Sequence, residues 1–316
     1  MACLTSMIEP LRAANEIADC QAFRWRILAE SRAKVASSAM VVFEPEMALA
    51  EADDLDFLFI LSSPTARFTD EKASEGQLRR LARHGTAMGG VSGGVFPLAR
   101  SGLLDGRDVS VHWCYEAAFA QEFPELRMRD DVIVFDHPRY TVSGSAAAFD
   151  LMVNFIEGKL GADVATEVAC WFQHAVVRGR GIRQKIPTFR RDSTADLLPS
   201  SVAKAVDILG RHLSEPIAVE DVAQSVGVSS RQLERQFKKA TGQSPGRYYR
   251  TLRMKAARQL VLFSKEPMPR IAAAVGYETV PPLTRHYREE FGTSPAEDRQ
   301  NINRFRFEDN RPLPLA

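Results

Sequence analysis

Residues 90–94, which read GVSGG, match the G-x-S-x-G pattern that places a serine nucleophile on a tight turn between a strand and a helix. A serine hydroxyl needs a positioned general base to become a nucleophile. No histidine adjoins Ser92, and the next ones along the chain are His112 and His137. The glycines also suit a sharp turn with close backbone packing. We therefore expect no catalytic residue here and keep a hydrolase that uses Ser92 as the alternative.

A second set of residues with suggestive chemistry lies in residues 219–245. Gly227 stands where the chain must turn sharply, Ser229 is placed to cap the next helix, and Gly242 ends that helix. Between the caps, apolar residues face one side and basic residues face the other. A short helix, a glycine turn and a capped helix with a basic outer face are typical of a helix-turn-helix, whose second helix enters the major groove of DNA.

The same pattern recurs at residues 271–295. Gly276 repeats the turn glycine at an offset of 49, and Gly292 repeats the terminating glycine at an offset of 50. Between the two copies, residues 246–264 predict an uninterrupted helix of about 17 residues, roughly 25 Å long. Such a helix can hold two recognition helices about one turn of DNA, roughly 34 Å, apart.

The elements that position these residues fall into two halves. In the first half, short apolar runs alternate with helical patterns; the runs lie at 23–30, 56–63, 87–92, 108–113, 131–136 and 140–144. This alternation predicts an α/β domain with a doubly wound sheet. The chain begins directly on a helix, so the first strand of such a sheet is missing from the sequence. We expect either that the start was assigned too late or that the sheet is one strand short.

Charge divides the chain at the same place. Residues 1–177 hold 16 Lys and Arg against 25 Asp and Glu, whereas residues 178–316 hold 25 against 15. A basic half favours a polyanionic partner for that half, and a solvated basic surface is the alternative. We predict a sensor domain at 1–177, a basic linker at 178–198, an all-α domain with two helix-turn-helix units at 199–301, and a tail at 302–316. The four scattered cysteines predict no metal cage or disulfide framework and favour a reducing cytoplasm.

The motifs VAQSVGVSSRQLERQFKKATGQSP and IAAAVGYETV…LTRHYREEFGTSP make residues 205–300 similar to the DNA-binding domain of AraC/XylS-type regulators. The resemblance implies that both recognition helices dock in successive major grooves. Carried over by position, it predicts base contacts from Arg231, Glu234 and Arg235. It predicts phosphate contacts from Lys238, Lys239 and Arg250.

The second unit departs from the family pattern. Val280-Pro281-Pro282-Leu283 stands where small polar residues are usual, and Asp298-Arg299 replaces a Tyr-Arg pair, which removes an aromatic packing residue. Proline is tolerated in the first turn of a helix, so we expect the helix to survive. Thr284, Arg285 and Arg288 remain as predicted DNA contacts. We expect them to bind mainly phosphate, with weaker sequence discrimination.

The first half resembles the PfpI-like, class I glutamine-amidotransferase-like domain, on the stretches SMIEPLRAAN, GTAMGGVSGGVFPLARSGLLDGRDVSVHW and TVSGSAAAFDLM. Regulators of the GlxA type join such a domain to an AraC-type C-terminus, and the resemblance implies a sensor for amino acids, betaines or related amines. Ligands of doubly wound sheets sit at the carboxyl ends of the strands. The residues that we expect near that edge are Glu9, Ser62, Ser63, Ser92, His112, Trp113 and Ser143.

Together these patterns predict a cytoplasmic, sequence-specific transcriptional regulator that binds double-stranded DNA and a small nitrogenous effector. We expect a homodimer and consider RNA polymerase as a further partner. We expect no cofactor, no metal and no membrane association. Two alternatives stay open: an amidase or hydrolase that uses Ser92, and a degenerate regulator with impaired sensing.

Overall fold

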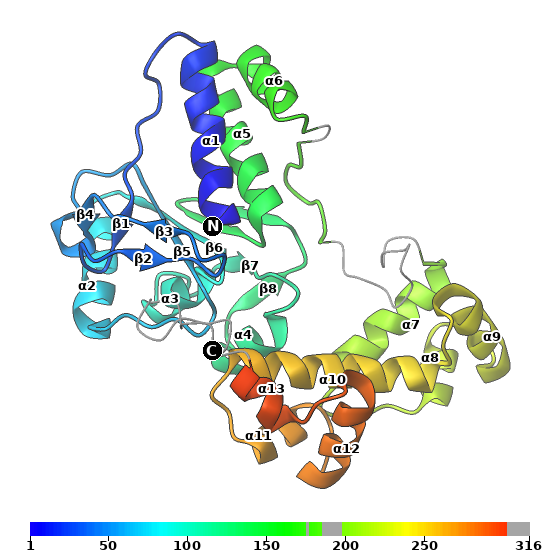
Figure 1. The fold of residues 1–316 in the computed structure, drawn as a ribbon. Helices are drawn as coiled ribbons and strands as arrows, with labels where there is room; N and C mark the ends of the chain where they lie inside the picture. Colours follow the sequence, from blue (N-terminus) through cyan, green and yellow to red (C-terminus); the bar gives the residue numbers. More distant parts are fainter. Residues whose placement is uncertain (175–176, 185–197, 302–316) are drawn as a thin grey trace. The chain divides into compact units, whose positions relative to one another are not determined.

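A computed structural model describes residues 1–174, 177–184 and 198–301 of the chain (Figure 1). The described residues form two compact units, which we call the first unit (up to Gln184) and the second unit (residues 198–301). Most of the predicted linker and the whole predicted tail, residues 185–197 and 302–316, lie outside the described residues. Among the residues that are described, no helix has the length and apolar character needed to cross a bilayer.

A four-stranded sheet forms the centre of the first unit. Its order is β5 (Phe57–Ser62), β6 (Ala87–Ser92), β10 (Arg139–Val142) and β9 (Ile133–Asp136). The first three strands are parallel, and β9 runs antiparallel to β10. These strands coincide with four of the predicted apolar runs, and their backbone groups are satisfied through neighbouring strands.

Helices cover both faces of this sheet. On one face, α1 (Ala2–Ile17) and α5 (Ser145–Leu160) bury Met7 and Leu151 against Val91, and α6 (Ala162–Trp171) packs on both helices. The opposite face meets α3 (Val95–Arg100), since a Cβ on Gly90 would lie 2.8 Å from the Cα of Val95. Another helix, α2 (Glu71–Arg83), precedes β6. The predicted α/β fold class is confirmed.

Short elements complete the first unit. Strands β1 (Leu28–Ala29) and β4 (Met47–Ala48) pair in parallel, and β2 (Val35–Ala36) and β3 (Val42–Phe43) pair antiparallel, before the single turn η1 (Leu49–Glu51). Strand β7 (Asp108–Ser110) pairs with β8 (Arg127–Arg129), and α4 (Glu116–Glu122) lies between them in the chain. The apolar runs at 23–30 and 108–113 therefore form shorter strands than the pattern indicates.

The second unit is helical throughout its described residues. It contains α7 (Ser200–Arg211), α8 (Val219–Ser225), α9 (Ser230–Thr241), α10 (Pro245–Phe263), α11 (Met268–Ala274), α12 (Val280–Phe291) and α13 (Pro295–Asn301). Helices α8 and α9 form one helix-turn-helix and α11 and α12 form the other. The predicted helix between them is α10, which at 19 residues is about 28 Å long.

The second helix-turn-helix contacts both α10 and the loop before α8. The guanidinium of Arg253, on α10, donates to the carbonyl oxygens of Val275 and Gly276 and lies over the ring of Tyr277. Gly276 adopts φ of +71°, and a Cβ there would lie 2.8 Å from the carbonyl oxygen of Leu213 in the loop before α8. The turn of the second helix-turn-helix is thus fixed against α10 and against the loop before α8.

Replacing Gly276 by alanine is expected to destabilise the chain more than the same change at Gly227. Both glycines have φ above +70°, so each alanine carries a left-handed backbone cost of about 1–2 kcal/mol. Only at Gly276 does the new Cβ also meet the preceding loop, whereas nothing lies within 4 Å at Gly227. We expect a further loss of about 1–3 kcal/mol from this overlap. Urea denaturation followed by circular dichroism measures the difference, and equal losses would contradict it.

Candidate DNA-binding interface and effector site

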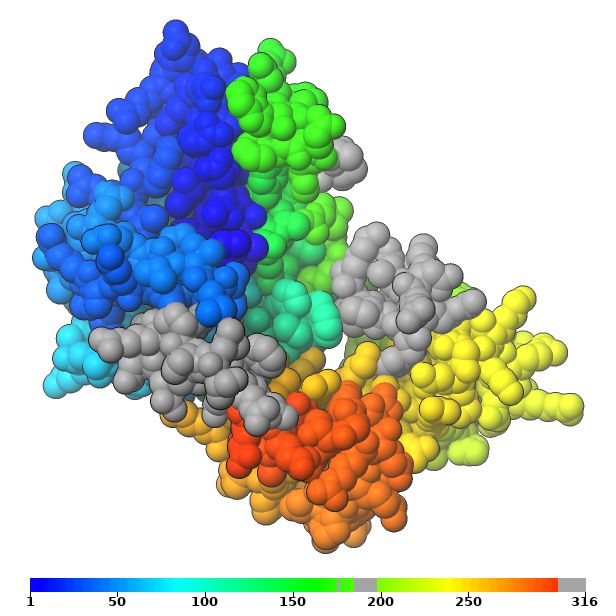
Figure 2. Space-filling model, viewed as in Figure 1, coloured from blue at the N-terminus to red at the C-terminus, as the bar shows by residue number. Residues whose placement is uncertain are grey.

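The first recognition helix, α9, separates apolar from charged residues. Leu233 and Phe237 are fully buried in the core that α9 shares with α7, α8 and α10. The Ser229 hydroxyl caps the helix by accepting from the N–H of Gln232, and Gly242 ends it with φ of +77°. All the predicted contact residues of α9 are exposed on the other side: Arg231, Glu234, Arg235, Lys238 and Lys239. In Figure 2, long side chains stand out from this yellow part of the surface.

The second recognition helix, α12, has the same length and the same register of caps. It begins after Thr279 and ends at Gly292 with φ of +71°, each 50 residues beyond the corresponding cap of α9. As expected, two prolines in its first turn do not prevent the helix from forming. A shallow hollow at its N-terminal end is lined by Val280, Pro281, Thr284, Arg285, Arg288 and Glu289. The three predicted contact residues of α12 therefore lie together on its outer side.

Asp298 and Arg299, which stand after α12 where the family pattern has a Tyr-Arg pair, form polar contacts. Asp298 is buried, accepts a hydrogen bond of 2.7 Å from the Tyr287 hydroxyl and pairs with Arg258 at 2.8 Å. Arg299 donates to the carbonyl oxygen of Val261, near the end of α10. Polar contacts thus hold α13 in place where the family pattern suggests aromatic packing. Arg250, the remaining predicted phosphate contact, is exposed on α10.

Three of the predicted effector residues lie at the carboxyl edge of the central sheet. Ser62 and Ser92 end neighbouring strands and are register partners, and Ser143 follows directly after Val142 of β10. Because these three strands are parallel, their carboxyl ends meet at one edge. Ser63 continues from Ser62 at the same end and is exposed.

Aromatic residues from the segment after β7 reach this edge. A Cβ on Gly144 would lie 3.4 Å from Cδ2 of His112, which places the imidazole beside the β10 end. The rings of Trp113 and Tyr115 have their centroids 5.4 Å and 5.5 Å from that of His112. Side-chain hydrogen bonding also joins Tyr115 to Ser92. Tyr115 is a residue that the sequence analysis missed, although the HWCY stretch, rich in aromatic residues, could have drawn attention to it.

Glu9 interacts with a residue of its own helix, α1. Its carboxylate accepts from Nε of Arg12 at 3.0 Å on the same helix, and Arg12 also pairs with Glu16. The acidic residue beside the aromatic group is instead Glu116. Burial, together with the negative charge of Asp130, raises the pKa of Glu116 to about 7.

The turn around Ser92 has the shape of a nucleophile elbow. Ser92 adopts a left-handed φ of +54°, which is uncommon for a residue with a side chain. Its side chain interacts with Tyr115, while Nδ1 of His112 accepts from the N–H of Cys114 at 3.2 Å. Burial lowers the pKa of His112, and raises the pKa of the Cys114 thiol to about 11, so this thiol stays protonated near neutral pH.

Residues 177–184, which we call the exit segment, lie along the first unit close to this edge. The side chain of Gln184 donates to the carbonyl oxygen of Val111 at 2.7 Å and accepts from the N–H of Trp113 at 3.0 Å. It therefore holds the backbone on both sides of His112. At the start of the segment, Nε of Arg178 donates to Asp150, a fully buried carboxylate on α5, at 2.6 Å. These contacts join residues far apart in the sequence, so no local pattern indicated them.

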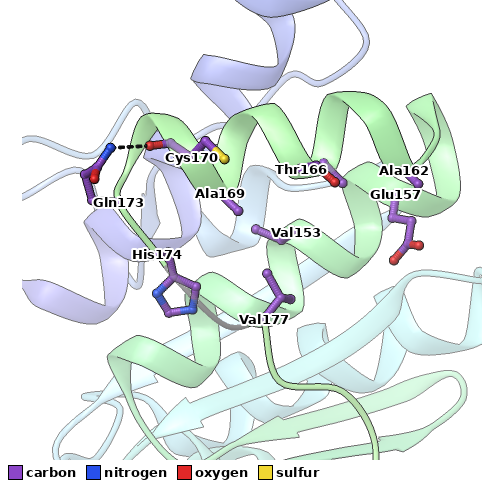
Figure 3. A pocket seen from close by; sticks show the side chains of 10 residues that line it. Val153, Glu157, Ala162, Thr166, Ala169, Cys170, Gln173, His174 and Val177 are labelled. Carbon is purple, nitrogen blue, oxygen red and sulfur yellow. Dashed lines mark hydrogen bonds between the residues drawn. The ribbon is translucent and has the colours of Figure 1, made fainter.

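A separate hollow of about 440 Å³ lies between α5 and α6. Figure 3 shows Val153 and Glu157 from α5, Thr166 and Cys170 from α6, and His174 after α6 around it. His174 also pairs with Asp150 at 2.7 Å. None of the predicted effector residues lines this hollow. No group of three His, Cys, Asp or Glu side chains suited to a metal ion occurs within the described ranges.

Two capped recognition helices with exposed cationic residues, fixed on one rigid helix and joined in one chain to an α/β unit, define a DNA-binding protein of the helix-turn-helix class. A family model described as a helix-turn-helix domain matches residues 222–301. The HTH-type transcriptional regulator GbdR of Pseudomonas aeruginosa is 32% identical over 297 residues, which cover 94% of this chain and 80% of GbdR. GlxA of Rhizobium meliloti is 32% identical and covers 92% of this chain and 89% of its own.

The chain belongs to the AraC family of transcriptional regulators. The predicted similarity to GlxA-type regulators is confirmed by the relatives along nearly the whole chain. An AraC family regulator from Pseudomonas putida with a crystal structure is 24% identical, with a TM-score of 0.49 over 54% of this chain and 92% of its own. The full-length relatives are regulators by name, which agrees with the expectation that the chain is not an enzyme.

Two alanine substitutions on α9 are expected to weaken DNA binding in different ways. Arg235→Ala should cost about 1–3 kcal/mol and relax the preference at one base position. Lys238→Ala should weaken binding to all DNA sequences alike and lower the slope of log affinity against log salt concentration by about 1. Fluorescence anisotropy on a preferred duplex and on single-base variants of it, at several salt concentrations, separates the two effects. If Arg235→Ala leaves the base preference intact, its predicted role is wrong.

Proposed function

We propose that this chain is a cytoplasmic transcriptional regulator that reads an operator with α9 and α12 and responds to a small nitrogenous effector bound by the first unit. The DNA-binding part of this proposal is supported by the duplicated outer face of the two recognition helices. Leu233 and Leu283 are buried at matching positions, and Arg235 and Arg285 are exposed at matching positions. A core residue and a cation that repeat together at one offset favour two DNA contacts of the same kind.

The geometry of α10 supports simultaneous docking of both helices. A helix of about 28 Å is close to the rise of one turn of B-DNA, roughly 34 Å. The contacts of Arg253 and Gly276 fix the second helix-turn-helix against this helix. One chain then reads two successive segments of the major groove, and Arg250 contacts the phosphate backbone.

The aromatic group at the carboxyl edge supports an amine as the effector. His112, Trp113 and Tyr115 gather their rings beside Ser92 and Ser143. Aromatic faces attract ammonium groups, and quaternary amines in particular, by cation–π interaction. The serine hydroxyls supply hydrogen bonds for a carboxylate or hydroxyl on the same molecule. Because the Glu9 carboxylate is paired with Arg12, we give Glu9 a smaller role in effector binding than the aromatic rings.

The exit segment supplies a route from effector to DNA. An effector that displaces His112 or Trp113 also acts on Gln184, which is bonded to the backbone on either side of His112. The chain continues from Gln184 towards the DNA-binding unit. The effector then shifts the population of arrangements in which α9 and α12 reach their sites. We further propose a homodimer, with RNA polymerase as a partner at the promoter.

The central experiment separates this function from a hydrolase. Purified full-length chain and its Ser92→Ala variant are tested for binding to fragments of bacterial promoter DNA, and for hydrolysis of a panel of amide and ester substrates. We expect sequence-specific binding by both proteins and turnover by neither. Turnover that disappears in Ser92→Ala would favour the hydrolase, and absence of DNA binding at low salt would refute the proposal.

Gln184→Ala is expected to uncouple effector from DNA binding. The variant loses the two hydrogen bonds beside His112, whereas the second unit keeps all its described contacts. We therefore expect unchanged DNA affinity without effector and at least a several-fold smaller response to whichever amino acid or quaternary amine raises the melting temperature of the wild-type chain. Gln173→Ala is the matched control, because within the part of the chain that the structure describes its side chain bonds only to the carbonyl oxygen of Cys170 in the same turn. An unchanged response in Gln184→Ala would contradict the proposed route.

A further inference from the structure

The two recognition helices present different chemistry at equivalent places. The outer face of α9 begins with Arg231 and Glu234, both exposed and charged. At the same offset of 50 residues, α12 has Pro281 and Thr284. In register, Arg235 matches Arg285 and Lys238 matches Arg288, whereas Lys239 is replaced by Glu289. The loss of Arg231 and Glu234 falls in the N-terminal half of the helix, and the N-terminal residues of a recognition helix contact the edges of the bases.

The first turn of α12 has little capacity for hydrogen bonding. Val280 and Pro281 carry no polar side-chain atom, and the N–H groups of a proline pair are absent. Together with Thr284, whose side chain carries a methyl group, they line the hollow at the N-terminal end of the helix, which is mainly apolar. Among the base edges in the major groove, the complement of such a surface is the C5-methyl group of thymine.

The flanking charges favour DNA as the occupant of this hollow. Arg285 and Arg288 line it and are exposed, and within the described residues neither forms a salt bridge. Residues 178–316 carry 25 Lys and Arg against 15 Asp and Glu. Glu289 also lines the hollow, at the side away from Pro281, where a carboxylate can accept from the amino group of cytosine. An apolar surface flanked by arginines fits a thymine, because the arginines can neutralise the neighbouring phosphates.

We propose that α12 recognises thymine through its methyl group, using Val280, Pro281 and the Thr284 methyl, while α9 recognises a G·C pair through Arg231 and Glu234. This inference rests on the proposed function and makes it more specific. It replaces the sequence-based expectation that the second unit mainly binds phosphate. The operator is consequently asymmetric, with a G·C-containing segment under α9 and a thymine-containing segment under α12.

The test removes single methyl groups from the DNA. Full-length chain first selects its preferred sequences from a random duplex library, and Arg235→Ala identifies which segment lies under α9. Each thymine in the other segment is then replaced by deoxyuridine, which lacks only the C5-methyl group. We expect the Kd to rise about four-fold at one or two positions, the effect of burying one methyl group. Deoxyuridine in the α9 segment should have no effect.

Two variants make the assignment specific to α12. In Pro281→Ser, which keeps a small side chain at the helix start but removes one of the three apolar contacts, the loss of affinity on the same deoxyuridine substitutions should become smaller. In Pro281→Arg, which copies Arg231, selection should return guanine in place of thymine. Because an added arginine strengthens binding to any DNA, the base preference is the measurement, and the circular dichroism of both variants shows that α12 still forms.

The outcomes distinguish this inference from the function on which it rests. Specific DNA binding with no deoxyuridine effect in the α12 segment would overturn thymine recognition and leave the regulator intact. Selection of G·C pairs under both helices would overturn it as well. A library without any preferred sequence would refute the proposed function itself.

Discussion

What the second unit presents to DNA depends on one uninterrupted helix. The first half of α10 buries Tyr248 and Tyr249 in the core of the first helix-turn-helix, and its second half buries Met254 and Leu260 towards the second. A bend within α10 would break backbone hydrogen bonds and open both cores at once. The separation of the two recognition helices is thus set by backbone geometry, and the choice of DNA sequence is left to the exposed side chains.

The first unit works under a different constraint, which is close approach of backbone segments. Gly90 lets α3 come directly beneath β6, and Gly93 lies against the backbone of Ser63 and Pro64. This crowding holds Ser92 in its left-handed conformation at the edge of the sheet. The same edge receives the aromatic residues after β7, and the exit segment is bonded to their backbone. The proposed effector site and the exit segment therefore share their supporting structure.

Much of this architecture follows from local patterns. Ser229, Gly242 and the buried stripe of α9 are signals within one or two turns, and their repetition made the duplication readable. The four main strands were also predictable, because each coincides with a short apolar run. The short strands β2 to β4 were not, since pairs of two residues carry no periodicity.

The contacts that escaped prediction are those between distant residues. Gln184 meets residues more than 70 positions earlier, and the pairing of Asp298 with Arg258 compensates for a lost aromatic residue from 40 positions away. Neither residue type nor spacing reveals such a partner. The same holds for the aromatic group at the sheet edge, where His112 and Trp113 were anticipated but Tyr115 was recognised only from its contact with Ser92.

The position of α7 has a consequence for how the protein lies on a promoter. Helix α7 packs into the core of the first helix-turn-helix through Val202 and Leu209, so the chain from the first unit enters beside α9 and not beside α12. Because the recognition helices at its two ends differ, the DNA-binding unit has a direction along the DNA. Reversing the operator would then exchange the DNA segments under α9 and α12, so the two orientations of the site would not be equivalent.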